Sequence, residues 1–448
     1  MLPPDLNQIP VGPPSLPGTL SDWLDLLESR HPRAVDLGLD RVNAIWQRMG
    51  RPYPAPRIFT VAGTNGKGST VSTLCSLLGA LGHSHGSYTS PHVEDYNERV
   101  RINGEPVSDE VLLDAFSRIE NYRGDLSLSY FEFGTLAAID ILSRSKLDFA
   151  VMEVGLGGRL DAVNILDADC AVITPIGLDH QEYLGEDRES IGREKAGIIR
   201  EGKAVVCGDA DPPASLLEVA ARRGAHLRLL GRDFSIVESA GQAHFSMEGL
   251  ELDVPLPVLA GAHQLNNMAT ALAALFELIP SARKKPAELS DGLRSVSLHG
   301  RFERVRDHPA VWLDVGHNPL AAGVVAEAMA DALQAGGLGQ CRCVLGMLVD
   351  KDVASVAAAM DPVIDAWYCA GIGSDRGQTG AELAGRLVQS GLVLDVREFA
   401  TVGEALDSAL ADSRDQDAVL VFGSFLTVTD AMRHLNTDTA RIHTEGQG

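Results

Sequence analysis

The chain has 448 residues, more than one hydrophobic core usually organises, so its length favours two domains. Its net charge is −23, from 38 Lys+Arg against 61 Asp+Glu, and this acidic balance argues against a nucleic-acid partner, which needs clustered basic charge. An anionic small ligand must therefore be bound by backbone amides, a few basic side chains or metal ions.

The first 18 residues are rich in proline, and we interpret them as a flexible leader. They lack the basic start and apolar core of a signal peptide, and no apolar stretch in the chain reaches the roughly 18 residues of a membrane span. The sequence therefore predicts a cytoplasmic protein with no membrane partner. Six cysteines form no CxxC pair, which argues against a zinc site or a disulfide frame.

The first part of the chain alternates helical and extended patterns. Helical spacing begins in "TLSDWLDLLESRHP", with Ser21 as the predicted N-cap. Short apolar runs that end at Gly or Ser then alternate with helix-like stretches, and these runs are "RIFTVAG", "HSHGSYTS", "LDFAVMEVG", "DCAVITPIG" and "KAVVCG". Such alternation predicts a mostly parallel sheet with helices on both faces.

The pattern changes over residues 225–258, where shorter alternating segments predict a small antiparallel appendage. A long helix is predicted in "GAHQLNNMATALAALFELI", and a second series of strands and helices starts at "AVWLDVGHNP". We place a domain boundary near residue 298, which gives two α/β domains over 19–297 and 298–448. Because sites in open α/β sheets lie beyond the carboxyl ends of the strands, the domains are predicted to face each other across a cleft.

The stretch "FTVAGTNGKGSTVS", residues 59–72, places three glycines and a lysine between a predicted strand and a predicted helix. Glycines at 63, 66 and 68 permit positive φ and remove Cβ atoms, so backbone N–H groups can converge on an anion. We interpret the stretch as a phosphate cradle with Lys67 as its counter-charge. It departs from the strict G-x-x-x-x-G-K-[ST] pattern, and a plain strand-to-helix turn is the alternative.

Three further residues are candidates for chemistry at this cradle. Glu153 ends a predicted buried strand, where an acidic side chain can hold magnesium, although it can also simply face solvent. His180 follows another strand and is either a metal-binding imidazole or an ordinary histidine. Lys195 lies in "RESIGREKAGII"; a buried lysine there would be neutral and nucleophilic, whereas a surface lysine would be solvated.

A family resemblance rests on motifs spread over the chain. These are "VAGTNGKGST", "YTSPHVEDYNERVRING", "YFEFGTLAA", "MEVGLGGRLDAVN", "ITPIGLDHQEYLG", "REKAGII", "HGRFE" and "LDVGHNP". In this order they resemble the bifunctional dihydrofolate synthase/folylpolyglutamate synthases, a family of Mur-ligase-like ATP-dependent amide ligases, from about residue 20 to 430. The resemblance implies an amino-terminal ATPase domain with a phosphate loop and a carboxy-terminal Rossmann-like domain.

The resemblance also implies an activity. A pterin-bearing carboxylate would attack the γ-phosphate of ATP to give an acyl phosphate and ADP, and the amine of L-glutamate would then displace phosphate. The substrates would be dihydropteroate and folates, and ATP would be the co-substrate. Two Mg²⁺ ions would be bound, and the protein would work as a monomer.

Site residues are implied position by position. ATP binding is implied for Thr64, Asn65, Gly66, Lys67, Asn267, Arg301 and Asp314, metal binding for Ser90, Glu153 and His180, and catalytic roles for Lys67, Lys195, Arg301 and His317. A dihydropteroate site is implied at Val35, Asp36, Leu37, Ser129, Tyr130, Phe131, Glu132, Leu160, Asp161 and Ala162. In the resembling family the lysine that matches Lys195 is modified to a carbamate, which could hold the second metal ion. For the aromatic residues, the start of a buried helix is an equally good interpretation.

Three rival functions are weighed against this one. A phosphate-loop GTPase would need a guanine-selecting Asn-Lys-x-Asp element, which the chain lacks. A ligase that only extends folates, or one that acts on cell-wall precursors, would share the nucleotide site. A binding module that has lost catalysis has no need to combine the charged residues named above.

Overall fold

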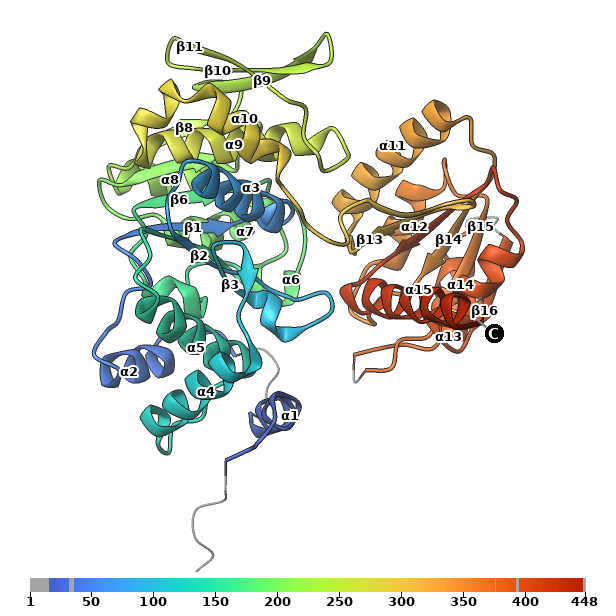
Figure 1. The fold of residues 1–448 in the computed structure, drawn as a ribbon, viewed down its shortest axis with the longest axis horizontal. Helices are drawn as coiled ribbons and strands as arrows, with labels where there is room; N and C mark the ends of the chain where they lie inside the picture. Colours follow the sequence, from blue (N-terminus) through green and yellow to red (C-terminus); the bar gives the residue numbers. More distant parts are fainter. Residues whose placement is uncertain (1–15, 32–35, 375, 392–394, 446–448) are drawn as a thin grey trace, which may run out of the picture.

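The computed structural model describes residues 16–31, 36–374, 376–391 and 395–445, so most of the predicted leader lies outside the described residues. The first part of the chain forms an eight-stranded sheet in the order β4-β3-β2-β5-β1-β6-β7-β8 (Figure 1). Its strands are β1 (Arg57–Ala62), β2 (His85–Tyr88), β3 (Val100–Ile102), β4 (Glu105–Pro106), β5 (Phe149–Glu153), β6 (Cys170–Ile173), β7 (Ala204–Cys207) and β8 (His226–Leu229). All neighbours pair in parallel except β2 with β3 and β3 with β4, which confirms the mostly parallel sheet.

Helices cover both faces of this sheet (Figure 1). They are α1 (Leu20–Arg30), α2 (Asp40–Arg48), α3 (Lys67–Ala80), α4 (Asp109–Arg123), α5 (Tyr130–Arg144), α6 (Gln181–Leu184), α7 (Arg188–Lys195), α8 (Ala214–Arg222), α9 (His263–Leu278) and α10 (Pro286–Arg294), with 3-10 turns η1 (Tyr96–Arg99), η2 (Ala162–Ile165), η3 (Ala196–Ile198) and η4 (Pro280–Lys284). Because side chains of a strand alternate, Phe59 of β1 joins the core formed with α3, α9 and α10, whereas Ile58 joins the core formed with α1, α2, α4 and α5.

The predicted N-cap of the first helix is wrong by two residues. Thr19 caps α1, since its Oγ1 accepts a hydrogen bond from the backbone N–H of Asp22 at 3.2 Å, and Ser21 lies inside the helix.

The predicted antiparallel appendage is confirmed as β9 (Phe234–Ser239), β10 (Gln242–Met247) and β11 (Leu250–Val254). Alternate residues of β10 are buried, and Phe245 packs against Phe276 of α9 with ring centroids 5.9 Å apart. The small sheet therefore covers α9 and completes the core on that face.

The second part of the chain forms a six-stranded sheet in the order β12-β13-β17-β14-β15-β16. Its strands are β12 (Glu303–Asp307), β13 (Ala310–Asp314), β14 (Cys341–Leu345), β15 (Ala366–Ala370), β16 (Asp395–Phe399) and β17 (Ala418–Phe422). Its helices are α11 (Pro319–Gly336), α12 (Val353–Met360), α13 (Gly380–Gln389), α14 (Val402–Ala411) and α15 (Phe425–Glu445). Cores on both faces confirm the expected doubly covered α/β arrangement, and only β12 runs antiparallel to its neighbour.

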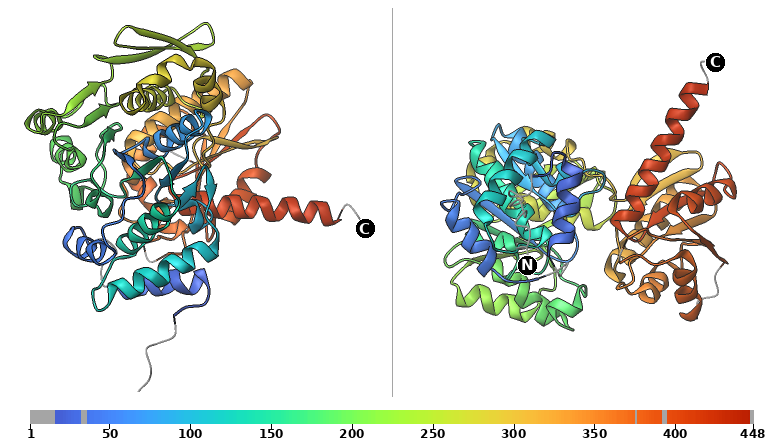
Figure 2. Two further views of the ribbon diagram at one scale, coloured as in Figure 1. Left: turned by 60° about the vertical axis from the view of Figure 1, so that its left-hand side comes forward. Right: turned by 90° about the horizontal axis from the view of Figure 1, so that it is seen from below.

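The two sheets lie side by side and are joined by residues 295–302, between the end of α10 and the start of β12 (Figure 1). The proposed domain boundary near residue 298 falls in this connection. At the other end of the chain, α15 projects away from the second sheet (Figure 2). Within the described ranges, every helix is too short or too polar to cross a bilayer.

Candidate active site

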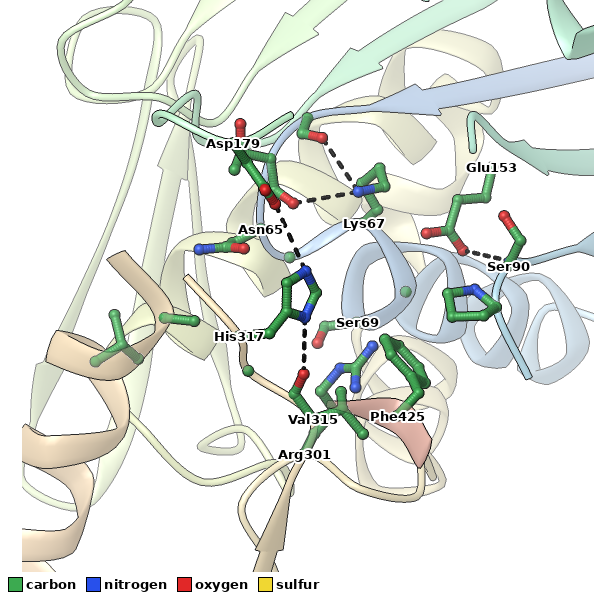
Figure 3. Close-up of a pocket in the computed structure, with 18 of the residues that line it drawn as sticks. Asn65, Lys67, Ser69, Ser90, Glu153, Asp179, Arg301, Val315, His317 and Phe425 are labelled. Carbon is green, nitrogen blue, oxygen red and sulfur yellow. Dashed lines mark hydrogen bonds and ion pairs between the residues drawn. The ribbon is translucent and has the colours of Figure 1, made fainter. Parts of the chain in front are cut away.

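A cleft lies where the carboxyl ends of β1 and β5 face the carboxyl end of β13, and it encloses about 1090 Å³, part of it open to solvent (Figure 3). Eleven predicted site residues line it, namely Thr64, Asn65, Gly66, Lys67, Ser90, Glu153, His180, Lys195, Arg301, Asp314 and His317. Both sheets contribute, as expected for sites of open α/β proteins. The nucleotide and metal residues inferred from the sequence are thus brought together, apart from Asn267, which packs beside Gly66 just outside the lining.

The loop between β1 and α3 depends on two glycines. Gly63 has a φ of +154° and Gly66 a φ of +86°, both in the region that favours glycine. A Cβ on Gly66 would lie 2.4 Å from Asn267 Oδ1. Gly68, in contrast, sits in the first turn of α3 without a positive φ, and a Cβ there would make ordinary contacts, so the expectation for this third glycine is wrong.

Two lysines converge on this loop. Lys67 Nζ donates to the backbone carbonyls of Gly63 at 3.1 Å and Thr64 at 3.2 Å, and Lys195 Nζ donates to the carbonyl of Gly63 at 2.8 Å. Lys195 is only 4% exposed, so the alternative of a solvated surface lysine is wrong. Burial, together with the charge of Lys67, lowers the pKa of Lys195 to about 7, which leaves a large fraction of neutral amine near neutral pH.

Glu153 presents a buried carboxylate with little local compensation. Among the described residues, its Oε2 accepts only a long hydrogen bond, 3.4 Å, from the backbone N–H of Ser90 (Figure 3). Burial raises the pKa of Glu153, and the positive charges of Lys67 and Arg301 oppose that rise. A cation bound here would satisfy a carboxylate that the protein alone leaves poorly solvated.

His180 supplies the neutral imidazole that metal binding requires. It precedes α6 with a φ of +50°, and burial, reinforced by neighbouring cations, lowers its pKa to about 4. In the described part of the chain, His, Cys, Asp and Glu side chains do not gather in threes as a complete metal set. The residues present fit a metal that is also held by a hydroxyl such as that of Ser90 and by nucleotide phosphates.

The connection before β12 contributes Arg301, and the end of β13 contributes Asp314. The guanidinium of Arg301 lies 5.1 Å from the ring centre of Phe425, and among the described residues it has no carboxylate within ion-pair distance. Asp314 accepts hydrogen bonds from the backbone N–H groups of Phe302 at 2.9 Å and Gly316 at 2.7 Å. Arg301 is therefore oriented by an aromatic ring with donors left for an anion.

Asp179 is a residue that the sequence analysis missed. Its carboxylate accepts hydrogen bonds from Lys351 Nζ at 2.9 Å and Asn318 Nδ2 at 3.3 Å. It also lies 3.5 Å from His317 Nε2 (Figure 3). Burial alone would favour the neutral acid, but the hydrogen bond from His317 and the surrounding cationic groups hold the pKa of Asp179 well below its usual range. His317, predicted as a phosphate contact, is thus held against Asp179 here.

The segments of the predicted pterin site lie next to one another, although Val35 is outside the described residues. Arg41 of α2 joins two of them, because its Nη1 lies 2.8 Å from Asp36 Oδ2 and its Nη2 lies 3.0 Å from Glu132 Oε1. The third segment is joined through the backbone N–H of Gly38, which donates to the carbonyl of Leu160 at 3.3 Å.

The side chains of this region are mostly engaged within the protein. Ser129 and Glu132 form a capping box at the start of α5, which supports the interpretation as a buried helix start. Tyr130 stacks 5.4 Å from the guanidinium of Arg99, and Phe131 covers Gly155. Asp161 accepts hydrogen bonds from backbone N–H groups at 2.8 and 2.9 Å, which favour its charged form. Burial has the larger effect and raises the pKa of Asp161 to about 7.

A phosphate-loop sheet facing a second α/β sheet across a charged cleft is the arrangement of a Mur-type ATP-dependent ligase. Two family profiles agree: the "Mur ligase middle domain" matches residues 130–275, and the "Mur ligase, glutamate ligase domain" matches residues 300–425. The dihydrofolate synthase/folylpolyglutamate synthase of Escherichia coli is 43% identical over 94% of this chain and 96% of its own. The chain belongs to the dihydrofolate synthase/folylpolyglutamate synthase family.

Solved structures are similar over the same extent. Escherichia coli FolC in complex with DHPP and ADP has a TM-score of 0.87 and 42% identity, covering 94% of this chain and 98% of that one. A bifunctional folylpolyglutamate synthase/dihydrofolate synthase with Mn, AMPPNP and L-glutamate bound has a TM-score of 0.84 and 43% identity, covering 93% and 98%.

Proposed function

We propose that this protein is an ATP-dependent ligase that joins L-glutamate to dihydropteroate, giving dihydrofolate, and to folates, giving their polyglutamates. The observation that carries the proposal is the cleft that Lys67, Glu153 and Arg301 line together beside the glycine-dependent loop. Relatives named for both activities, similar over nearly the whole chain, support it. We also propose that residues 19–297 and 298–448 are its two domains.

The chemistry follows from the weakness of a carboxylate as an electrophile. Its oxygen attacks the γ-phosphorus of ATP, the bond to ADP breaks, and the acyl phosphate gains a good leaving group. The amine of glutamate then attacks the acyl carbon, phosphate leaves with the electron pair of the broken bond, and the amine loses a proton. The protein's share is to orient the groups and to stabilise the charge that develops.

Each part of the cleft has a proposed task. Backbone N–H groups at the start of α3, with Lys67, bind the phosphates, and the forked donors of Arg301 suit two phosphate oxygens. Thr64, Asn65, Asn267 and Asp314 complete the nucleotide site. Magnesium neutralises phosphate charge when bound, and Ser90, Glu153 and His180 are the residues that would hold it. A carbamate on Lys195 would offer an oxygen ligand to a second ion.

Dihydropteroate is proposed to bind where residues 36–37, 129–132 and 160–162 meet, and Val35 is proposed to contribute to the same site. The closeness of these segments around Arg41 supports this placement. We further propose that the protein works as a monomer, because one chain supplies both sides of the cleft, and that it acts in the cytoplasm, where ATP is available.

The test is a coupled assay with purified protein, ATP, Mg²⁺, L-glutamate and dihydropteroate. We expect one phosphate released per amide formed, and a parallel reaction with a folate in place of dihydropteroate. Turnover of folate alone would make the enzyme an extender only, and turnover of neither would overturn the proposal. A preference for GTP over ATP would favour the rival switch protein.

A further inference from the structure

The loop over residues 89–99 is closed and cross-linked by its own hydrogen bonds. Its ends meet where the backbone N–H of Thr89 donates to the carbonyl of Arg99 at 2.9 Å. Inside it, the carboxylate of Glu98 accepts the backbone N–H groups of residues 93–95 at 3.0, 2.8 and 2.8 Å. These bonds cross-link the loop internally, and Asn97 also joins it to Val107 and Asp109 by hydrogen bonds of 2.8 and 2.9 Å.

One side chain of this loop is buried in the second sheet's core. Val93 is 7% exposed and belongs to the apolar cluster of Val315, Val428 and Ala431, and it is the only described member of that cluster that precedes residue 300. Figure 1 shows the segment between β2 and β3 reaching toward α15.

Two hydrogen bonds fix the same contact. Thr429 Oγ1 donates to the backbone carbonyl of Val93, and Arg433 Nη2 donates to the carbonyl of Glu94 at 3.2 Å. Both donors lie on α15. The loop is therefore attached to the second sheet by apolar packing and by its backbone.

The same loop enters the cleft three residues earlier. Ser90 lines the cleft, and its backbone N–H donates to Glu153 Oε2 (Figure 3). A shift of the second sheet would therefore displace Val93. Through the hydrogen-bonded loop it would also displace Ser90 and change the contact between Ser90 and Glu153.

We propose that Val93 is a positioning residue: its packing in the core under α15 holds Ser90 in contact with Glu153. The position of the second sheet is thereby coupled to the arrangement of the metal-binding residues in the nucleotide site. The proposal rests on the proposed function, because it takes Ser90 and Glu153 as the metal-binding pair. Val93 itself touches no reacting group.

The test changes the contact from each side. Val93→Ala removes two buried methyl groups without touching the bonds to Glu98, and Thr429→Val removes the hydrogen bond without changing the loop. The measured quantity is the dissociation constant of ADP by calorimetry, with and without Mn²⁺. In the wild type, Mn²⁺ should strengthen ADP binding by a certain factor, and we expect this factor to be roughly fivefold to tenfold smaller in each variant. The ADP affinity measured without Mn²⁺ should stay within about twofold of wild type.

Two controls isolate the effect. Val93→Ile keeps an apolar side chain at the contact and should retain the wild-type gain, and Val111→Ala changes an exposed valine on α4. An unchanged gain in both test variants would overturn the coupling. A loss of the gain in Val93→Ala but not in Thr429→Val would also overturn it, because the effect would then be local to the loop. Equal weakening of ADP binding with and without Mn²⁺ would overturn it as well, because this would indicate a general change of the cleft. If wild-type protein shows no gain with Mn²⁺, the metal site of the proposed function fails instead.

Discussion

Lys351 donates a 2.9 Å hydrogen bond to Asp179 across the cleft, and both side chains are nearly buried, at 8% and 12% exposed. Asp179 follows β6 of the first sheet, and Lys351 follows β14 of the second. A charge pair so little exposed to solvent is not easily replaced by water, so its loss leaves the remaining charge poorly compensated. We infer that this pair helps to hold the two sides of the site together.

Lys351→Met should therefore reduce the turnover of dihydropteroate. Asp179 keeps its contacts with His317 and Asn318, so we expect the loss to be roughly 1–3 kcal/mol, below the value for a fully orphaned buried charge. Steady-state kinetics of Lys351→Met, Asp179→Asn and the double variant form the test. Losses that simply add would show that the two residues act independently.

Gly66→Ala should damage the phosphate loop. The new Cβ would lie 2.4 Å from Asn267 Oδ1 at a φ of +86°, and strain of this kind costs about 1–3 kcal/mol. We expect a lower melting temperature and weaker ADP binding. The matched control is Gly68→Ala, where the Cβ would lie 3.6 Å from Leu298 and 3.7 Å from Arg301, which are ordinary contact distances, and alanine favours the helix, so its melting temperature should not fall. Equal losses in both variants would contradict this account.

Lys67→Ala should remove most turnover. Its ammonium group hydrogen-bonds only to backbone carbonyls among the described residues, so the change deletes a charge at the loop without orphaning a buried carboxylate partner. Electrostatic terms at a transferring phosphoryl group are worth about 3–4 kcal/mol, a rate loss of several hundredfold. Rapid-quench measurement of ADP formation checks this, and a near-normal rate with an unchanged melting temperature would rule out Lys67 as the counter-charge.

The central strands and the phosphate loop could be predicted from the sequence because their signals are local. The edge strands β12 and β16 could not, since "ERVRD" and "DVREF" are mostly exposed and lack an apolar run. The burial of Lys195 was left as one of two alternatives, and the pairing of Asp179 with Lys351 was missed, for another reason. Both arise from contacts between segments that are far apart in the sequence, and the local sequence around either residue carries no signal of these contacts.

Lys195 should react with CO₂ at a pH at which exposed lysines do not. Carbamate formation needs the neutral amine, and the neutral fraction rises with pH through the pKa of about 7. At a fixed concentration of dissolved CO₂ we therefore expect the modification to increase from pH 6 to 8, whereas an ordinary lysine titrates near about 10.4. A ¹³C carbamate signal that is present in wild type and absent in Lys195→Ala would support this. A signal that appears only above pH 9 would exclude the lowered pKa.

Arg41 connects Asp36 to Glu132, two residues proposed to bind dihydropteroate, and its removal should weaken that substrate selectively. Glu132 is buried, so Arg41→Ala leaves its carboxylate without the guanidinium, and it removes one of the contacts of Asp36, which His31 also contacts at 3.2 Å. We expect the KM for dihydropteroate to rise about tenfold, a loss of about 1.4 kcal/mol, while the KM for ATP stays within twofold. The KM of Arg41→Lys for dihydropteroate should lie between those of wild type and Arg41→Ala, because lysine lacks the forked guanidinium that contacts both carboxylates.

The matched control for Arg41 is Arg48→Ala on the same helix, because among the described residues Arg48 donates only to the backbone carbonyls of Tyr122 and Arg123. Its kinetics should resemble those of wild type even if its melting temperature falls slightly. Since the nucleotide cleft contains none of the Arg41 contacts, a structural defect spread through the protein would raise both KM values together. A parallel rise for ATP and dihydropteroate in Arg41→Ala would therefore count against a pterin site at this junction.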